Sequence, residues 1–213
     1  YFNRFSRTYS VLIPYLKTHN LTVSDAIISH QDNDHAGGAA HFINAGFGES
    51  FKRFHPHGTT TQCISLDYNF NGLRISSFAD STFNNENDNS CVLLIKSHQL
   101  TMLLTGDISK ARELSLIKTH SLQADVILSP HHGSDTSSST EFINHVNPHT
   151  VIHSTAFQGQ WQFPSEKVVS RYKAINAKQY VTARDGQITV SIYQDSFKVT
   201  TARKHESYWF IED

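Results

Sequence analysis

The chain has 213 residues, with 18 Lys and Arg against 19 Asp and Glu, 38% hydrophobic residues and 11% aromatic residues. This composition is typical of one globular domain and excludes disordered, collagen-like and coiled-coil chains. No apolar run approaches the roughly 18 residues of a membrane span. The formal net charge of -1 gives no general argument for nucleic-acid binding, although a neutral protein can still carry local basic patches.

The first residue is Tyr1 rather than Met, and the first ten residues do not resemble a signal peptide. A fragment or a processed chain is therefore expected. The two cysteines, Cys63 and Cys91, are too few for a disulfide framework or a four-thiolate zinc site. They are expected to be buried thiols, with a single disulfide as the open alternative.

Apolar periodicity and breaker residues predict alternating helices and strands along the chain. A helix through residues 11–16 ends near Asn20, and a buried strand at 26–29 leads into a polar turn and a short helix at 39–45. β-structure is expected over 52–79, before an Asn-rich loop at 82–90. The later elements are strands at 91–96 and 101–105, a helix at 110–119, a strand at 125–129, a helix at 138–146, a strand at 150–154, a helix from beyond Pro164 to 177, and strands at 178–182, 187–193 and 197–202. This order predicts one layered α/β domain over residues 1–213.

Histidine is the unusual residue type, with 14 copies in the chain, and imidazole is the commonest metal ligand. Residues 29–38 read Ser-His-Gln-Asp-Asn-Asp-His-Ala-Gly-Gly, which places His30, Asp32, Asp34 and His35 within six positions after a buried strand. Imidazole and carboxylate groups together hold divalent metal ions. A polar surface turn is the alternative, but two His and two Asp in this order favour a metal site.

Two later strand ends carry the same kinds of side chain. Asp107 ends the segment Leu-Leu-Thr-Gly-Asp, and His131 and His132 stand within Ser-Pro-His-His-Gly-Ser. Sites in α/β sheets form beyond the carboxyl ends of the strands, so the three clusters are expected to converge. Taken alone, Asp107 has the alternative interpretation of a turn or capping residue. Taken together, the clusters predict a metal centre.

The order His-x-Asp-x-Asp-His, Leu-Leu-Thr-Gly-Asp and Pro-His-His-Gly-Ser resembles the metallo-β-lactamase-fold domain at the C-terminus of the ComEC/Rec2 competence proteins. The resemblance extends from residues 11–16 to residues 185–187. It implies a metallo-β-lactamase-like αββα sandwich whose first strands lie before Tyr1 or are missing. It also implies a soluble, extracytoplasmic (periplasmic) domain of an inner-membrane DNA-uptake protein, with the channel and OB-fold portions of that protein as partners. This domain would degrade one DNA strand while the other enters the cell.

The resemblance also implies roles for single residues. The implied metal ligands are His30, Asp32, Asp34, His35, Asp107 and His132, with Asp107 as the bridge between two ions. Asp34 and His131 are the implied catalytic residues, His131 being a proton donor or a further ligand. The family usually has a His near the position of Pro164, whereas this chain has Gln-Trp-Gln-Phe-Pro there. A weakened second site and replacement by His153 or by a hydroxyl group both stay open.

Asp32 stands where the generic motif of the fold has His, and a hard oxygen ligand shifts the metal preference from zinc toward manganese or magnesium. The prediction is two divalent ions, with manganese ahead of zinc. Such a pair activates water and clamps the attacking and leaving oxygens of a phosphodiester, while His131 protonates the leaving oxygen. The predicted activity is that of a metal-dependent DNase that favours single strands.

Hydroxyl and basic side chains near the motifs are candidates for binding the substrate. Ser134 and Ser137 follow the paired His and are expected either to donate to phosphate or to cap the next helix. Lys167 and Arg171 share one face of the helix after Pro164, where a solvated helix face is the alternative. In that loop, the aromatic residues at 161 and 163 are packing residues or base-stacking platforms.

Two other functions stay open. A catalytically weakened module that guides DNA or has a structural role would account for the absent His near Pro164. A hydrolase of small phosphoesters is also compatible, because a fold alone does not fix the substrate.

Overall fold

A computed structural model describes residues 6–48, 63 and 65–203 of the chain. The predicted β-structure over 52–62 lies outside these residues. Within the described ranges, the helices are all too short or too polar to cross a membrane.

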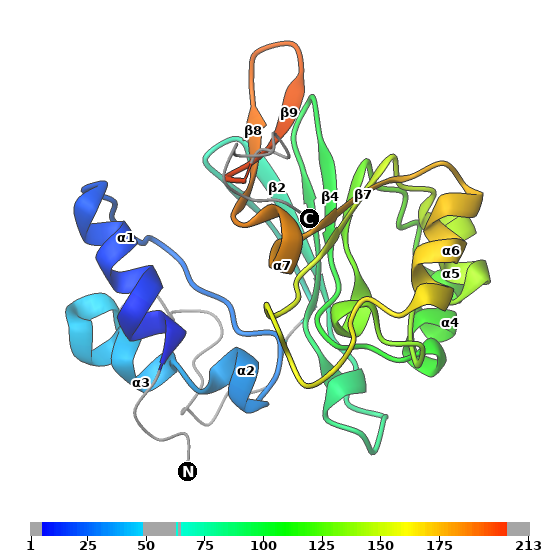
Figure 1. The fold of residues 1–213 in the computed structure, drawn as a ribbon, viewed down its shortest axis with the longest axis horizontal. Helices are drawn as coiled ribbons and strands as arrows, with labels where there is room; N and C mark the ends of the chain where they lie inside the picture. The colour runs from blue at the N-terminus through cyan, green and yellow to red at the C-terminus, as the bar shows by residue number, and fades with distance from the viewer. Residues whose placement is uncertain (1–5, 49–62, 64, 204–213) are drawn as a thin grey trace, which may run out of the picture.

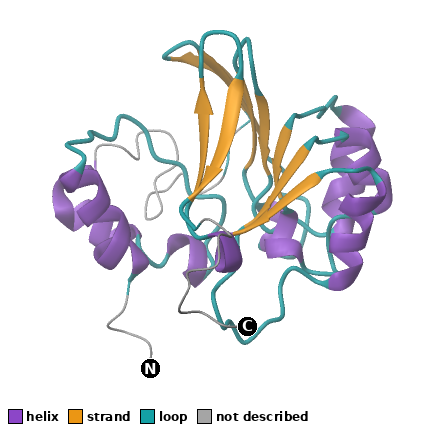
Figure 2. Ribbon diagram, turned by 45° about the horizontal axis from the view of Figure 1, so that its top comes forward, coloured by secondary structure: helices purple, strands orange, loops and turns teal. Residues whose placement is uncertain are grey.

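A seven-stranded sheet forms the centre of the molecule, with the strands in sequence order (Figures 1 and 2). Its strands are β1 (Leu66–Phe70), β2 (Leu73–Phe78), β3 (Val92–Lys96), β4 (Thr101–Leu104), β5 (Val126–Leu128), β6 (Thr150–His153) and β7 (Lys178–Val181). Strands β1 to β4 pair antiparallel and β4 to β7 pair parallel. The turn between β1 and β2 is made by Asn71 and Gly72, both with positive φ, which is the sequence signal for a tight hairpin. A separate hairpin is formed by β8 (Ile188–Ile192) and β9 (Phe197–Thr201).

Three helices cover one face of the parallel half of the sheet (Figure 2). They are α4 (Lys110–Thr119), α5 (Thr140–Val146) and α6 (Glu166–Ala174). Each begins at a serine whose hydroxyl accepts a backbone N–H of the first turn, namely Ser109, Ser139 and Ser165. Such N-caps satisfy donors that the helix itself leaves unpaired, which explains why these helices start where they do.

Alternate residues of the strands face two different layers, as the period of a β-strand requires. Leu103 and Ile127 are fully buried in the core with Phe142 of α5. Val126 and Ile152, which point to the opposite face, pack with the β8–β9 hairpin. The layers are therefore helices, the main sheet and the small sheet, which confirms the layered α/β prediction.

Leu16, Ala39 and Phe42 form a separate small core among the N-terminal helices, which lie away from α4 to α6 (Figure 1). These helices are the π-helix η1 (Thr8–Leu12), α1 (Ile13–Thr18), α2 (Asn33–Ala36), α3 (Ala39–Phe42) and the π-helix η2 (Ile43–Phe47). Three further single turns of helix in the described residues are η4 (Asn87–Asn89), η5 (Pro130–Gly133) and α7 (Thr182–Asp185). The first helix ends near Asn20, as predicted, and that residue has a φ of 52°.

The strand predicted at residues 26–29 is wrong. A strand needs a ladder of backbone hydrogen bonds to a neighbouring strand. Among the described residues, this segment makes one backbone–backbone hydrogen bond, in which the Ser29 C=O accepts the N–H of Cys91 at 2.8 Å. The side chain of Ile27 packs against Cys91 and Leu93. The segment is therefore half-buried beside the start of β3 without joining the sheet.

The expectation of two free thiols is also wrong, and its alternative is confirmed. Cys63 and Cys91 form a disulfide between Cα atoms 5.2 Å apart, linking positions 28 residues apart in sequence. The bond ties the chain ahead of β1 to the residue that precedes β3.

A buried carboxylate holds the loop that leads into α5. Glu113 of α4 is fully buried and accepts hydrogen bonds from the backbone N–H groups of Ser138 and Ser139 and from the Ser139 hydroxyl. Burial raises the pKa of Glu113, and these hydrogen bonds act in the opposite direction. The loop they fix connects the paired histidines after β5 to α5.

We predict that Glu113→Gln lowers the free energy of unfolding by about 1 to 3 kcal/mol, because the amide NH₂ would face a backbone donor and leave it unpaired. Urea-induced unfolding measures the change, with Glu141→Gln at an exposed position of α5 as the control. Equal stability of the two variants would contradict this role for Glu113.

Candidate metal centre

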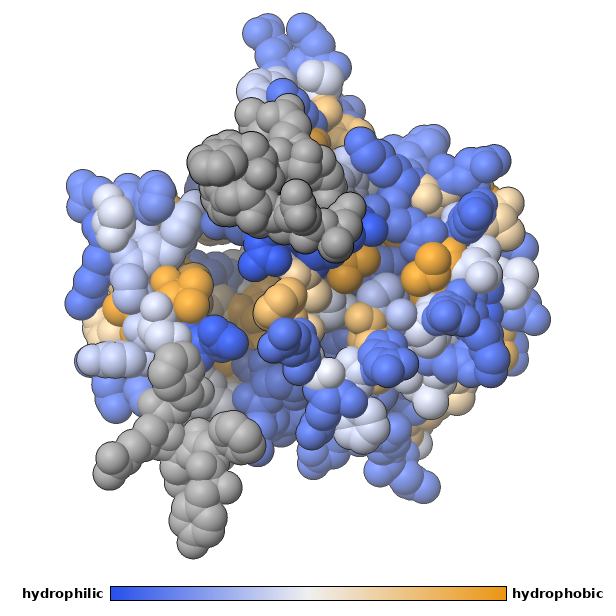
Figure 3. Space-filling model, viewed as in Figure 1, coloured by the Kyte–Doolittle hydropathy of each residue, from blue (hydrophilic) through white to orange (hydrophobic). Residues whose placement is uncertain are grey.

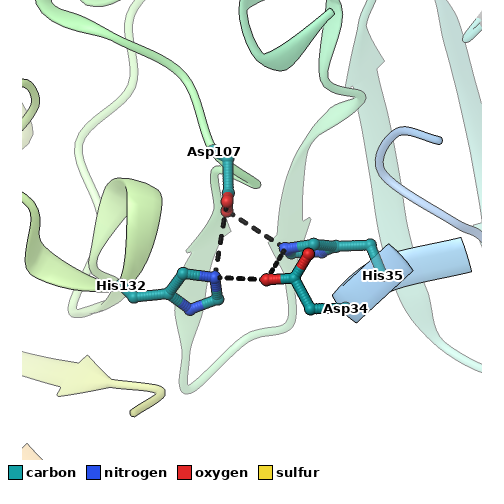
Figure 4. A group of neighbouring side chains, drawn as sticks. All are labelled: Asp34, His35, Asp107 and His132. Atoms are coloured by element: carbon teal, nitrogen blue, oxygen red, sulfur yellow. Dashed lines mark hydrogen bonds and ion pairs between the residues drawn. The ribbon is translucent and has the colours of Figure 1, made fainter. Parts of the chain in front are cut away.

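The three ligand clusters of the sequence meet beyond the carboxyl ends of β4 and β5 (Figure 4). Asp34 and His35 come from α2, Asp107 follows β4, and His132 lies in η5 after β5. One donor atom from each of these four residues lies within 4.8 Å of the other three. Two carboxylates and two imidazoles are a ligand set that suits a divalent metal ion.

The Asp107 carboxylate occupies the centre of the group. Its Oδ1 lies 3.2 Å from His35 Nε2, and its Oδ2 lies 3.3 Å from His132 Nε2. Its Oδ2 is also 4.0 Å from the Nε2 of His30 and 4.0 Å from that of His131. One buried carboxylate therefore adjoins four imidazoles.

The carboxylates of Asp34 and Asp32 each contact at least one of these imidazoles. The Asp34 carboxylate is 3.2 Å from His132 Nε2, and that of Asp32 is 3.6 Å from His30 Nε2. All six predicted ligands therefore stand within one continuous set of carboxylate and imidazole contacts. His30 and Asp32 lie outside the tightest group of four.

The charges in the group favour a cation between the carboxylates. Burial opposes ionisation of Asp107, but the hydrogen bonds and charges of His132 and His35 outweigh it, so the pKa of Asp107 lies well below its usual range. The hydrogen bond to Asp107 raises the pKa of His132 to about 9, against the effect of burial. Burial and the neighbouring His35 lower the pKa of His30, which keeps its imidazole neutral.

Two buried nitrogen atoms supply a direct test of whether these residues fit a metal. The Nε2 atom of His30 is buried and has no hydrogen-bond partner among the described residues, and that of His35 is buried and faces the Asp107 carboxylate at 3.2 Å. A buried polar atom without a partner is costly, and a metal ion bound to Nε2 would remove that cost. The residues therefore fit a divalent ion.

Unusual backbone conformations bring the ligands together. His131 and His132 have φ values of 49° and 56°, a left-handed region that is rare for residues other than glycine and is found at functional sites. Gly106 precedes Asp107 with a φ of 59°, and a Cβ there would lie 2.8 Å from the Ser90 side chain. The Gly106 C=O accepts the His131 N–H at 3.1 Å, which locks the two turns to each other.

Two serine hydroxyls lie behind the imidazoles. Ser29 Oγ is 3.0 Å from His30 Nδ1 and 3.1 Å from His35 Nδ1. Ser90 Oγ is 3.3 Å from His30 Nδ1 and accepts the Asp107 N–H at 3.1 Å. An imidazole that donates from Nδ1 presents the lone pair of Nε2 to a metal. Neither serine is among the predicted site residues, although Ser29 stands directly before the motif and could have been recognised as a neighbour of the ligands.

The paired histidines have different surroundings. His132 Nδ1 donates to the Ser154 C=O at 2.8 Å, and its Nε2 faces the carboxylates of Asp34 and Asp107. His131 Nδ1 is 3.3 Å from Thr136 Oγ1, and its side chain is 28% exposed. His131 therefore lies outside the group of four closest residues.

His153 does not replace the His that is absent near Pro164. It is fully buried, and its Nε2 is 3.1 Å from Gln179 Oε1. Burial lowers the pKa of His153 to about 4. Its Nδ1 faces Gly133, where a Cβ would lie only 3.0 Å away. This imidazole packs behind the paired histidines and does not join the ligand group.

Three of the predicted substrate-binding residues are engaged within the protein. The Ser137 hydroxyl donates to the C=O groups of Pro130 and Ser134, and Ser134 Oγ is 2.9 Å from Thr136 Oγ1. The guanidinium of Arg171 donates to two carbonyl groups of the same loop, each at 3.2 Å, and to Asp135.

Lys167 pairs with Asp135 at 2.7 Å, yet its side chain is 73% exposed. Its role in substrate binding stays a prediction. The contacts of Ser137 and Arg171 instead give those residues a part in holding the loop after the paired histidines.

We predict that Ser29→Ala raises the Kd for Mn²⁺ about 10- to 100-fold, because partners behind the ligands fix the orientation of an imidazole. Titration of Mn²⁺ followed by electron paramagnetic resonance measures the change, with Ser170→Ala at an exposed position of α6 as the control. An unchanged Kd in the Ser29 variant would show that this hydroxyl does not orient the ligands.

Comparisons with known proteins place this geometry in context. No family model matches the chain. Recombination protein 2 of Haemophilus influenzae is 30% identical over 93% of the chain, and Competence protein ComA of Neisseria gonorrhoeae is 28% identical over 86%. The chain spans about a quarter of the length of these relatives, 26% and 27% respectively.

Among solved structures, Igni18, a metallo hydrolase of Ignicoccus hospitalis, matches with a TM-score of 0.50 and 18% identity, over 91% of this chain and 85% of that one. This likeness concerns the fold alone. The homologues of the chain are thus competence proteins of the ComEC/Rec2 type, and its mixed α/β fold is metallo-β-lactamase-like.

Proposed function

We propose that this chain is a metal-dependent phosphodiesterase that hydrolyses DNA and favours single strands. The observation that carries the proposal is the group of Asp34, His35, Asp107 and His132, whose donor atoms lie within 4.8 Å of one another. The similarity to competence proteins supports DNA as the substrate.

The six ligands divide between two divalent ions. His30 and Asp32 would hold one ion, Asp34, His35 and His132 the other, and the Asp107 carboxylate would contact both. When bound, the ions supply Lewis acidity and an activated water for attack on phosphorus. The carboxylate of Asp32 favours a hard ion, which puts manganese ahead of zinc.

Two residues of the chain are proposed to move protons. Asp34 has the most exposed side chain of the closest group, 64% against 6% for Asp107, so it faces incoming substrate and is assigned as both ligand and proton acceptor. His131 is assigned as the donor to the leaving oxygen. The Thr136 hydroxyl lies 3.3 Å from Nδ1 of His131, and the Nε2 atom of that ring is 4.0 Å from the Asp107 carboxylate.

In the whole protein, we propose that the domain degrades the non-transforming strand during DNA uptake, beside the membrane channel and the OB-fold portion. The Cys63–Cys91 disulfide supports a position on the periplasmic side of the inner membrane, because disulfides persist in oxidising compartments.

A module that guides DNA with little turnover is the second candidate. The segment around Pro164 carries Gln160, Trp161, Gln162 and Phe163 and offers no imidazole. Metal content and turnover separate this candidate from the nuclease.

The first test is digestion of end-labelled single-stranded DNA in Mn²⁺, with EDTA as one control. We expect activity in the wild type and its loss in Asp34→Ala/His35→Ala, because that variant removes two ligands of the closest group. Asp195→Ala/His149→Ala, which changes an exposed acid and an exposed His elsewhere, should keep full activity. Absence of activity in Mn²⁺, Zn²⁺ and Mg²⁺, with no bound metal, would favour the guiding module. Turnover of a small chromogenic phosphodiester without digestion of DNA would instead indicate a small-substrate hydrolase.

A second prediction separates the two adjacent histidines. His131→Gln should retain the bound metal and lower kcat about 10²- to 10⁴-fold, the contribution typical of a positioned proton donor. His132→Gln should lose metal. Elemental analysis beside steady-state kinetics measures both effects, and metal loss in the His131 variant would make that residue a ligand.

A further inference from the structure

Two aromatic rings continue a stack that begins at the His132 ring and leads outward from the candidate metal centre. The Phe163 ring lies 6.5 Å from that of His132 at an interplanar angle of 21°, and the Trp161 ring lies 6.4 Å from Phe163 at 18°. Both pairs are nearly parallel and lie within the range of separations found for interacting rings. Trp161 and Phe163 are called the aromatic platform below.

The aromatic platform is anchored to the same turn that carries the metal ligand. The Ser165 N–H donates to the Gly133 C=O at 2.9 Å, and the Phe163 N–H donates to the Trp161 C=O at 2.9 Å. Gly133 packs so closely on Pro164 that a Cβ would lie 2.6 Å from its ring. Contacts of Pro164 and Ser165 therefore hold Phe163 beside the His132 turn, and a backbone bond ties Trp161 to Phe163.

The outer ring of the platform is open to solvent. Trp161 is 66% exposed, while Phe163 beneath it is half-buried. A large ring held parallel to a supporting ring, with its surface in water, is the arrangement on which a planar ligand stacks.

Several basic side chains that could bind a polyanion are engaged with acids. Many basic groups are already paired with acids: Arg74 with Asp67, Arg112 with Asp80, Lys167 and Arg171 with Asp135, and Arg184 with Asp185. In the view of Figure 3, hydrophilic side chains predominate and apolar ones form separate patches. Contacts to bases must therefore supply a larger share of the affinity than they do on a basic surface.

We propose that Trp161, supported by Phe163, stacks on an unpaired nucleobase next to the phosphodiester held at the metal centre. This inference rests on the proposed function and adds a binding site for the base. The strand would run from the ligand group past His132, so that a base beside the cut bond meets the exposed Trp161 ring. Bases inside a duplex are covered by their neighbours and offer no free face, which gives the site its preference for single strands.

The test measures binding of two fluorescent oligonucleotides by anisotropy. One is oligo-dT, and the other has the same backbone with abasic residues in place of the bases. A His131→Gln background in Mn²⁺ slows cutting during the measurement. Trp161→Ala is compared with Trp161→Phe, which keeps a stacking ring. A second control is Phe157→Ala, which removes a ring of similar exposure, 67%, that contacts Arg203 rather than the platform.

We expect Trp161→Ala to bind oligo-dT about 5- to 150-fold more weakly, the range that corresponds to loss of one base stacked on an aromatic ring. Binding of the abasic strand should not change, and Trp161→Phe and Phe157→Ala should stay near the parent protein. Equal affinity of the Trp161→Ala variant and its parent for oligo-dT, with digestion by the wild type intact, would overturn the platform and leave the nuclease standing. Failure of the wild type to bind or cut either strand would overturn both.

Discussion

The buried carboxylate of Asp107 is the group on which the rest of the site depends. It is 6% exposed and adjoins the imidazoles of four histidines from two different turns. An ionised carboxylate is tolerated at such a position only where positive charge or hydrogen-bond donors surround it. The chain supplies the imidazoles from segments that precede β1 and follow β5, while the carboxylate itself follows β4. The group can therefore assemble only when all three segments are in place.

The framework around this carboxylate consists of hydrogen bonds to the backbone of the turns and the loop that surround it. The parallel strands β4 and β5 end side by side, and the left-handed turn of His131 and His132 is bonded to the turn of Gly106. Behind them, Glu113 fixes the loop into α5, and Arg171 binds carbonyl groups of that loop. A rigid shell of this kind allows ligands to be held in strained conformations.

The surroundings of the metal centre differ from side to side. On one side Ser29 and Ser90 contact the Nδ1 atoms of His30 and His35. On another, Phe163 contacts His132 and leads outward to the exposed ring of Trp161. The aromatic residues stand in the loop before Pro164, where the resemblance led us to expect a His and the sequence has none.

The sequence alone predicted most of the helices, the main strands and the residues that meet at the candidate metal centre. These features are encoded by residues close together in the chain: serine caps one turn ahead of their helices, alternation within strands, and four ligands within six positions. Only the tertiary structure decided what depends on distant partners. The segment at 26–29 finds no ladder in the described residues, Ser90 reaches His30 across 60 residues, and Cys63 meets Cys91. The side chains of His153 and Arg171 could serve a site, but in the fold they bond to Gln179 and to the loop before α5. Local signals specify which residues form an element, whereas the direction of a side chain is fixed by neighbours that the chain brings together only on folding.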